Sequence, residues 1–317
     1  MNHFLEENDF NKEEIISVFE NAREFKKNRA NRPTEDLFGE SWGMLFYKNS
    51  TRTRVSFEVG IREMGGHPVL LDLSSTQIGR GESVKDTAKV LSRFLDGLII
   101  RTHGHELIEE FAHHASIPVV NALTDFLHPC QIYADCMTIL EKTSSTSNPY
   151  LGLKGKKVTF FGDTSCNMAN SWILAGALWD MDIWLCGPKE FKPTPKIQSF
   201  CQKAGLPANW HFTSDCREAV KDADVLYTDV WVSMGLEEEE ENRKEKMAEY
   251  QVTEDLLALA NDNSLFMHCM PAHPGEEVTE EVLSSPRSIL FNQAENRLHM
   301  QKAILKQLSK NNKLISQ

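Results

Sequence analysis

The sequence lacks paired cysteines and lacks an excess of basic residues, and each absence excludes a class of protein. Its seven cysteines are scattered and form no C-x-x-C pair, which argues against a structural zinc site and a disulfide framework. The formal net charge is -12, whereas a general nucleic-acid-binding protein needs a broad basic surface. We therefore expect no nucleic-acid partner, and any anionic ligand must meet a local basic pocket.

Long apolar runs and a dinucleotide motif are also absent. No stretch approaches 18 consecutive apolar residues, and the opening segment MNHFLEENDFNKEE is polar and acidic, so we expect no membrane span and no signal peptide. These features predict a cytoplasmic protein. The segment FFGDTSCNMANS lacks the G-x-G-x-x-G spacing, so binding of a nicotinamide cofactor is not expected.

The sequence does contain a repeated alternation of short apolar runs and helical segments. Its 317 residues, 41% of them hydrophobic and 25% charged, suffice for two globular domains. The alternation predicts an α/β fold with two domains, each with a mainly parallel sheet flanked by helices, and a junction near the Ser- and Thr-rich stretch 141–152. Strands are expected at residues 43–47, 69–72, 97–101, 117–121, 157–161, 182–186, 225–228 and 264–268, and a helix at 11–27.

The segment YKNSTRTRVSFEVG is a strand end followed by a helix start. Its residues Ser50, Thr51, Arg52 and Thr53 bring hydroxyl groups, a guanidinium and backbone N–H groups to a helix N-terminus. Hydrogen bonding and the helix dipole both favour a bound phosphate there. The alternative is ordinary helix capping with exposed arginines.

Two further polar positions follow expected strands in the first half. Arg101 ends the strand GLIIR, at the sheet edge where ligands gather, and it can bind phosphate or carbonyl oxygens; a structural ion pair is the alternative. His128 and Gln131 lie on either side of Pro129 at a helix start. Both can donate to an acyl oxygen, although a structural histidine is the alternative.

The second half carries groups suited to an amino acid. Asn167 lies one turn into a helix and can recognise a small carboxylate. The segment DVWVSMG offers Asp229 and Ser233 for an ammonium group and backbone N–H groups for a carboxylate. Cys269, in HCMPA, is either functional or a buried thiol. A nucleophilic pair with His268 is disfavoured, because adjacent strand residues point to opposite faces.

Together these segments resemble the transcarbamoylase family. STRTR and HPCQ are similar to its two carbamoyl-phosphate motifs, DVWVSMG and HCMP are similar to motifs of its ornithine branch, and the resemblance runs from residue 43 to 301. It implies transfer of a carbamoyl group from carbamoyl phosphate to the side-chain amine of L-ornithine, giving citrulline and phosphate, in arginine metabolism. No metal or cofactor is implied.

The resemblance also implies how the chain is organised and which residues act. A carbamoyl-phosphate-binding domain would span 1–142, completed by the helix 298–317, and an ornithine-binding domain would span 150–292. The catalytic residues would be Arg101, His128, Asp229 and Cys269. The carbamoyl-phosphate contacts would be Ser50, Thr51, Arg52, Thr53, Gln77, Arg101, His128, Gln131, Cys269, Met270 and Arg297. The ornithine contacts would be Leu123, Asn167, Asp229, Ser233 and Met234.

Assembly and substrate leave alternatives open. Family members are built on trimers with shared active sites, so we expect a homotrimer or a multiple of trimers in which Gln77 reaches a neighbouring site. Three residues depart from the common family pattern, Cys166, Met270 and Pro274. A transcarbamoylase for putrescine or N-acylated ornithine is the nearest alternative function. A catalytically silent paralogue acting as a binding module is another, and a NAD-dependent oxidoreductase is more distant.

Overall fold

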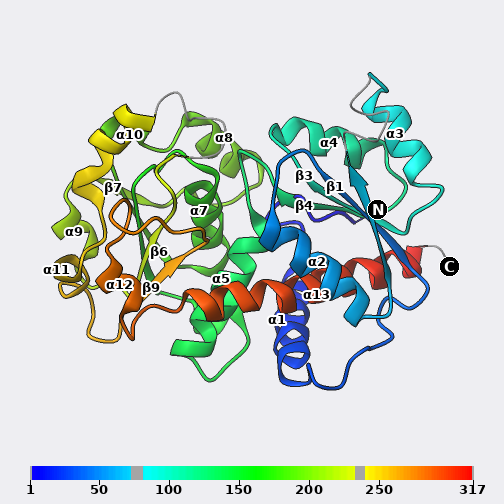
Figure 1. Cartoon of the computed structure of the whole chain (residues 1–317), viewed down its shortest axis with the longest axis horizontal. Coiled ribbons are helices and arrows are strands. Elements are labelled where there is room, and N and C mark those ends of the chain that lie inside the picture. The colour runs from blue at the N-terminus through cyan, green and yellow to red at the C-terminus, as the bar shows by residue number, and fades with distance from the viewer. Residues whose placement is uncertain (1, 73–80, 233–239, 316–317) are drawn as a thin grey trace. The chain divides into compact units, whose positions relative to one another are not determined.

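The computed structural model describes residues 2–72, 81–232 and 240–315. The chain forms two compact units. The first unit comprises Met1–Pro149 and Glu295–Gln317, and the second comprises Tyr150–Ala294. Each unit contains one parallel sheet with helices around it (Figure 1). The predicted α/β class with two helix-flanked parallel sheets is confirmed.

The sheet of the first unit has the strand order β2-β1-β3-β4, all parallel. Its last strand begins two residues later than predicted, because Pro118 has no N–H to donate to a sheet and the ladder starts beyond it. The strands are β1 (Ser41–Phe46), β2 (His67–Asp72), β3 (Gly97–Arg101) and β4 (Val119–Leu123).

Helix α1 (Lys12–Lys27) starts at a capping box, in which the Asn11 side chain accepts from the backbone N–H of Glu14 at 3.0 Å and the Glu14 carboxylate accepts from that of Asn11 at 2.9 Å. These two bonds satisfy N–H groups that a helix start leaves without partners. The other helices of this unit are α2 (Thr51–Glu63), α3 (Val84–Leu91), α4 (His105–His114), α5 (Pro129–Thr143) and the larger part of α13 (Leu290–Ile315).

Helix α13 is buried on every face over residues 296–305. This last helix, expected at 298–317, begins eight residues earlier, at Leu290. Its polar side chains are buried with partners: Asn296 donates to Thr138 at 2.9 Å, and Lys302 donates to Glu63 at 3.1 Å. Because these contacts compensate the loss of water, polar residues occupy positions that a sequence pattern assigns to solvent.

The sheet of the second unit has the order β7-β6-β5-β8-β9, again all parallel. Four of its strands lie at or within one residue of the predicted ranges: β5 (Lys157–Phe161), β6 (Asp182–Cys186), β8 (Val225–Thr228) and β9 (Leu265–His268). The edge strand β7 (His211–Thr213) was not predicted, because three residues, none of them fully buried, give no periodic pattern.

The second unit contains several short helices and one long one. Among its described residues, no helix is long and apolar enough to cross a membrane, and the same holds for the first unit. The helical segments are α6 (Pro149–Gly152), α7 (Asn167–Trp179), η2 (Lys189–Phe191), α8 (Pro195–Lys203), α9 (Cys216–Val220), α10 (Glu240–Met247), η4 (Ala248–Tyr250), α11 (Glu254–Leu257) and α12 (Glu280–Ser284).

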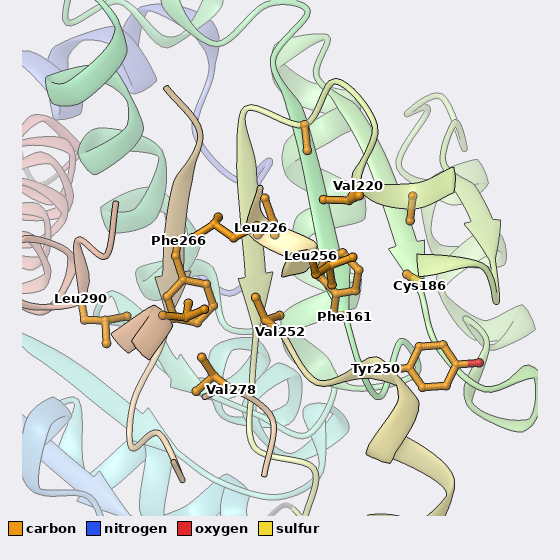
Figure 2. Close-up of a cluster of buried hydrophobic side chains, with 14 residues drawn as sticks. Phe161, Cys186, Val220, Leu226, Tyr250, Val252, Leu256, Phe266, Val278 and Leu290 are labelled. Atoms are coloured by element: carbon orange, nitrogen blue, oxygen red, sulfur yellow. The ribbon is translucent and has the colours of Figure 1, made fainter. Parts of the chain in front are cut away.

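A cluster of buried side chains packs against strands β5, β8 and β9 of the second unit (Figure 2). Phe161 of β5, Leu226 of β8 and Phe266 of β9 are fully buried in it. Truncating a buried phenylalanine typically costs about 3–5 kcal/mol, so the cluster holds the strands firmly. At the end of β5 the chain turns at Gly162, whose φ is +110°, and a Cβ on Gly187 would lie 2.1 Å from the Gly162 carbonyl oxygen. Both positions therefore require glycine.

Candidate functional site

In the first unit the expected phosphate residues follow neighbouring strands. Because β3 pairs with both β1 and β4 in parallel, the carboxyl ends of these three strands lie side by side at one sheet edge. Ser50 follows β1, Arg101 ends β3, and His128 follows β4. Ligands of open α/β sheets bind at such an edge.

Helix α2 begins as the sequence predicts. Ser50 is its N-cap, and the Ser50 hydroxyl accepts from the backbone N–H of Thr53 at 3.2 Å. Thr51 and Arg52 are exposed in the first turn, which contains no acidic residue. The N–H groups of this turn and the helix dipole therefore favour an anion. Helix capping by Ser50 and an anion site in the first turn of α2 are therefore compatible.

Arg297 brings a second guanidinium to this turn. It is 4% exposed, and its Nη2 donates to the Thr53 hydroxyl at 2.6 Å. Thr53 is itself buried. The contact joins helix α13 to the start of α2, so it holds a buried positive charge where the N-terminus of α2 also favours negative charge.

His128 is the N-cap of α5, with Pro129 as the first helical residue. Its imidazole is buried, and the pKa of His128 is held well below its usual value by burial and by the positive charges of Arg297 and Arg101. Both arginines are therefore close enough to act on the ring, and the ring is neutral at neutral pH. A neutral imidazole keeps one N–H donor.

Gln131 is oriented differently from the sequence expectation. Its Nε2 donates to the Asp135 carboxylate at 2.8 Å, and its Oε1 is buried with no hydrogen-bond partner among the described residues. One of the two amide N–H bonds is used by Asp135, and the Oε1 is an acceptor left for a ligand. The hydrogen bond to Asp135 therefore determines that the Oε1 of Gln131 is the end of the amide left for a ligand.

Lys48 ties together the two loops that carry these residues. Its ammonium group forms an ion pair with Asp125, which follows β4, and Lys48 itself follows β1. The remaining expected residue of this unit, Leu123, is the last residue of β4 and the register partner of Arg101. Gln77 lies outside the described residues.

In the second unit Asn167 and Asp229 follow neighbouring strands. Asn167 is the first residue of α7, after β5, rather than one turn into the helix as the sequence predicts. Asp229 follows β8, which pairs with β5. The Thr228 hydroxyl donates to the Phe161 carbonyl oxygen at 3.0 Å and joins the two strand ends. The pKa of the Cys166 thiol is raised well above its usual value, mainly because the thiol is buried and also because the carboxylates of Asp163 and Asp229 are close to it. Ser233 and Met234 lie outside the described residues.

Asp229 and Cys269 are in direct contact. The Asp229 Oδ1 accepts from the Cys269 thiol at 3.0 Å and from the backbone N–H of Val230 at 2.8 Å. The next residue, Met270, has φ +65°, a left-handed conformation that is uncommon for a side-chain-bearing residue. A hydrogen bond from its N–H to the His268 Nδ1 at 2.8 Å holds this turn.

The sequence predicts that the side chains of His268 and Cys269 point to opposite faces of a strand, and this prediction is wrong. A polar atom of each, together with one of Asp229, lies within 4.8 Å of the others, because Cys269 lies one residue beyond the end of β9 and escapes the strand alternation. A nucleophilic pair remains disfavoured. The His268 Nδ1 accepts from Met270, its Nε2 pairs with Glu277 at 3.2 Å, and the thiol hydrogen bond goes to Asp229.

Arg243 is a residue that the sequence reasoning did not single out. It lies on α10, is 5% exposed, donates from Nε to the Trp231 carbonyl oxygen at 2.9 Å and forms an ion pair with Asp163. Its guanidinium also lies over the Phe191 ring, 4.6 Å from the centroid. Asp163 precedes Asn167 and Trp231 follows Asp229, so Arg243 links both loops that carry the expected amino-acid contacts. Its only sequence signal is a basic residue after an acidic run, which is too common to be informative.

Two family models match most of the chain. The model described as "Aspartate/ornithine carbamoyltransferase, carbamoyl-P binding domain" matches residues 2–141, and the one described as "Aspartate/ornithine carbamoyltransferase, Asp/Orn binding domain" matches residues 154–308. The chain belongs to the aspartate/ornithine carbamoyltransferase family. Family membership explains why phosphate-binding features and amino-acid-binding features occur in separate units.

Individual carbamoyltransferases are similar over nearly their full length. An ornithine carbamoyltransferase of Geobacter sulfurreducens is 45% identical over 309 residues, covering 97% of this chain and 99% of that protein. The solved structure of ornithine carbamoyltransferase from Pyrococcus furiosus is 42% identical with a TM-score of 0.88, covering 98% of this chain and 97% of that one. The structure of anabolic ornithine carbamoyltransferase from Campylobacter jejuni is 38% identical with a TM-score of 0.88, covering 98% and 100%.

Proposed function

We propose that this chain transfers the carbamoyl group of carbamoyl phosphate to the side-chain amine of L-ornithine, which is the reaction of an ornithine carbamoyltransferase. The products are L-citrulline and phosphate. One observation carries the proposal: a helix N-terminus, two guanidinium groups and a neutral imidazole converge at one sheet edge of a family member. That combination suits a phosphorylated carbonyl compound, because it offers charge for the phosphate and a neutral donor for the carbonyl oxygen.

The phosphate is held by the first turn of α2. Ser50, Thr51, Arg52 and Thr53 supply N–H groups, hydroxyls and a guanidinium, and Arg297 adds charge behind Thr53. Because Thr53 and Arg297 are already hydrogen-bonded, little reorganisation is needed when the anion binds. Arg101 serves both the phosphate and the carbonyl oxygen.

The carbamoyl group is held by His128 and Gln131. The neutral His128 ring donates to the carbonyl oxygen and, with Arg101, stabilises the negative charge that develops on it. The Gln131 Oε1, which is buried without a hydrogen-bond partner among the described residues, accepts from the carbamoyl NH2 group, while the Gln131 Nε2 donates to Asp135. This assignment replaces the expected donor role of Gln131 with an acceptor role.

The ornithine head group is held by the second unit. Asn167 and the Met234 backbone bind the α-carboxylate, and Asp229 and Ser233 bind the α-amino group; Leu123 of the first unit lines the aliphatic part. Support comes from the neighbouring ends of β5 and β8, which bring the described pair Asn167 and Asp229 together. The match to an Asp/Orn binding domain is consistent with this assignment.

The reaction is attack by the neutral side-chain amine on the carbamoyl carbon. A C–N bond forms, the tetrahedral intermediate collapses, and the C–O bond to phosphate breaks. An alkyl ammonium group has a pKa near 10.4, so the site must favour the neutral amine. Asp229 and the thiol of Cys269, which are hydrogen-bonded to each other, flank this amine together with Met270. The nitrogen loses a proton on forming the amide, and the departing phosphate is a base that the reaction itself supplies.

Arg243 acts as a positioning residue for the ornithine half. Its contacts with Asp163 and with the Trp231 carbonyl oxygen fix the loop that carries Asn167 and the loop that carries Asp229. A buried arginine with a carboxylate and a carbonyl oxygen restrains the geometry more strongly than an exposed ion pair does.

The active assembly is a homotrimer or a multiple of trimers, in the cytoplasm, with Gln77 reaching a neighbouring site. Support comes from apolar side chains exposed on the first unit: Val69 and Leu70 on the edge strand β2, Val55 on α2, and Val90 and Phe94 in and after α3. Exposed apolar groups of this number favour contact with another chain. With citrulline as product, the role belongs to arginine metabolism.

The decisive experiment is formation of citrulline and phosphate by purified protein supplied with carbamoyl phosphate and L-ornithine, with the mass in solution measured in parallel. Putrescine and N-acetyl-ornithine in place of ornithine test the nearest alternative, since the proposed site requires a free α-amino group and α-carboxylate. Absence of turnover with every amine would favour the silent paralogue. Turnover of putrescine in preference to ornithine would reassign the substrate.

A direct titration of carbamoyl phosphate tests the phosphate assignment separately. Arg52→Ala is expected to weaken binding, whereas Arg54→Ala, which removes the other exposed arginine of the same helix turn, serves as the matched control. Equal affinities for the two variants would remove Arg52 from the phosphate site.

A further inference from the structure

A group of potential metal ligands lies in the first unit, and none of its members is assigned to substrate. One ligand atom each of Glu6, His105 and Glu109 lies within 4.8 Å of the other two. His105 and Glu109 are one turn apart on α4, so their side chains share a helix face. Glu6 comes from the segment before α1. Two distant parts of the chain therefore supply one cluster.

His105 is prepared to act as a ligand. It is 4% exposed, and its Nδ1 lies 3.1 Å from the Thr124 hydroxyl. That hydroxyl also accepts from the backbone N–H groups of Phe126 at 3.3 Å and Leu127 at 3.1 Å, so it is held in place and anchors the ring through Nδ1. The Nε2 is the ring nitrogen left for a ligand. An unprotonated Nε2 binds a metal through its lone pair, and a contact at the other ring nitrogen orients the ring.

The Nε2 of His105 faces the carboxylates without a hydrogen bond. It has no hydrogen-bond partner among the described residues, and the Glu6 Oε1 lies 3.9 Å away, beyond hydrogen-bonding distance. A buried polar atom without a partner is costly and calls for an explanation. A cation between the ring and the two carboxylates supplies one, because it accepts the lone pair and neutralises the acids.

The segment that carries Glu6 is already shaped around this position. The Asp9 carboxylate accepts from the backbone N–H of Glu6 at 2.9 Å and also from that of Leu5. These two hydrogen bonds hold the turn that presents Glu6 in place.

We propose that Glu6, His105 and Glu109 bind one divalent transition-metal ion of the Zn2+ or Co2+ type. An imidazole nitrogen with two carboxylate oxygens suits these ions, and solvent completes the coordination. Tetrahedral zinc ligands lie about 3.3 Å apart, so the carboxylates must move inward. Glu109 is exposed and Glu6 is half-buried, so rotation of their side chains supplies this movement. The ion fastens the first residues of the chain to α4.

The alternative is that His105 and Glu6 form only a long ion pair. Titration of the chelator-treated full-length protein with ZnCl2, followed by calorimetry, separates the two cases. The expected result is one saturable site that raises the melting temperature, as binding to the folded state requires. With CoCl2 the visible spectrum should lack a thiolate charge-transfer band, because no cysteine belongs to the site. Absence of saturable Zn2+ binding would overturn the proposal.

Three variants decide the location of the ion. Glu109→Gln, on an exposed position, should lower the Zn2+ affinity at least about 10-fold, by analogy with the loss of groups that support metal ligands. Glu110→Gln, its exposed neighbour on α4, should leave the affinity unchanged. Cys269→Ser removes the thiol of the cluster Asp229, His268 and Cys269 in the second unit. Unchanged affinity in Glu109→Gln, or loss of binding in Cys269→Ser, would contradict the proposal; His105→Asn is a supplementary variant whose folding is checked first.

Discussion

The proposed phosphate-binding residues of the first unit and the proposed ornithine-binding residues of the second unit, the phosphate half and the amino-acid half, are held in different ways. In the first unit, Thr53 and Arg297 lie on helices of 13 and 26 residues, and His128 caps a helix of 15 residues. All three side chains are buried, and Arg297 donates to Thr53. In the second unit, the described residues Asp229 and Cys269 lie just beyond strand ends. Hydrogen bonds within those loops and Arg243 of α10 hold them. The residues proposed to bind a rigid anion are thus held by helices, whereas those proposed to bind a flexible amino acid are held by loops.

Removal of Arg101 should produce the largest effect and should act on the phosphate half alone. Arg101→Ala removes a donor to the developing oxyanion, which typically costs about 100- to 1000-fold in rate. Carbamoyl-phosphate affinity should fall with it, while the affinity of the enzyme for ornithine alone should not. Steady-state kinetics and separate titrations of each substrate measure this, with Arg101→Lys as the charge-retaining control. An equal loss of affinity for both substrates would erase the distinction between the halves.

Arg243→Leu should produce the next largest effect, on the opposite half. Loss of the contacts to Asp163 and the Trp231 carbonyl oxygen leaves the loops around Asn167 and Asp229 without their shared support. We expect KM for ornithine to rise about 10- to 100-fold, in the range typical of lost supporting contacts, with carbamoyl-phosphate affinity unchanged. Lys246→Leu, on the exposed face of α10, is the matched control. Partial recovery in Arg243→Lys would separate positioning from a general loss of folding, which thermal melting monitors.

Thr53→Val should have a smaller effect. The substitution keeps the shape of the side chain and removes the hydroxyl that accepts from Arg297 at 2.6 Å. A hydrogen bond to a charged group contributes about 1.5–3 kcal/mol, and rotation of Arg297 toward the phosphate recovers part of it. We expect carbamoyl phosphate to bind about 10-fold more weakly in calorimetry. Unchanged binding would mean that Arg297 does not depend on Thr53 for its orientation.

Acid should destabilise the first unit more than the second, through histidines that are buried neutral. Burial lowers the pKa of His299, on α13, to about 4 from its ordinary 6.5. The unfolded chain binds this proton first, so the stabilisation is complete above pH 6.5 and is lost as the pH falls from 6.5 to 4. His299→Asn should therefore reduce the acid-induced loss of unfolding free energy by about 2 kcal/mol, since each pH unit between the two pKa values contributes about 1.4 kcal/mol. Urea denaturation of the variant and the wild type at pH 7 and pH 4.5 measures the loss of unfolding free energy in each protein. Equal losses in the two proteins would exclude His299 as the cause.

Much of the fold was predictable because apolar runs and turn signals specify buried parallel strands directly. Strands β3, β5, β6 and β8 have the predicted bounds. The capping role of Ser50 and the start of α5 at Pro129 were also predictable, since they depend on local chemistry. These features require only neighbouring residues to be known.

The remaining features depend on contacts between distant residues. The burial of α13 depends on partners such as Glu63, 239 positions away from Lys302. The role of Arg243 depends on Asp163, and the orientation of Gln131 depends on which end of its amide Asp135 binds. No periodicity in the sequence encodes such pairings. In each case the burial, role or orientation of a side chain depends on the residue that it contacts rather than on its amino-acid type.

The buried stretch 296–305 of α13 has a consequence for the order in which the protein is made. A ribosome produces the 149 residues of the first unit, then the whole second unit, and only then the segment whose side chains complete the first unit's interior. Nascent domains generally fold in the order of their synthesis. Here the unit synthesised first is completed last, so nascent chains should protect the middle of the sequence from protease before its beginning.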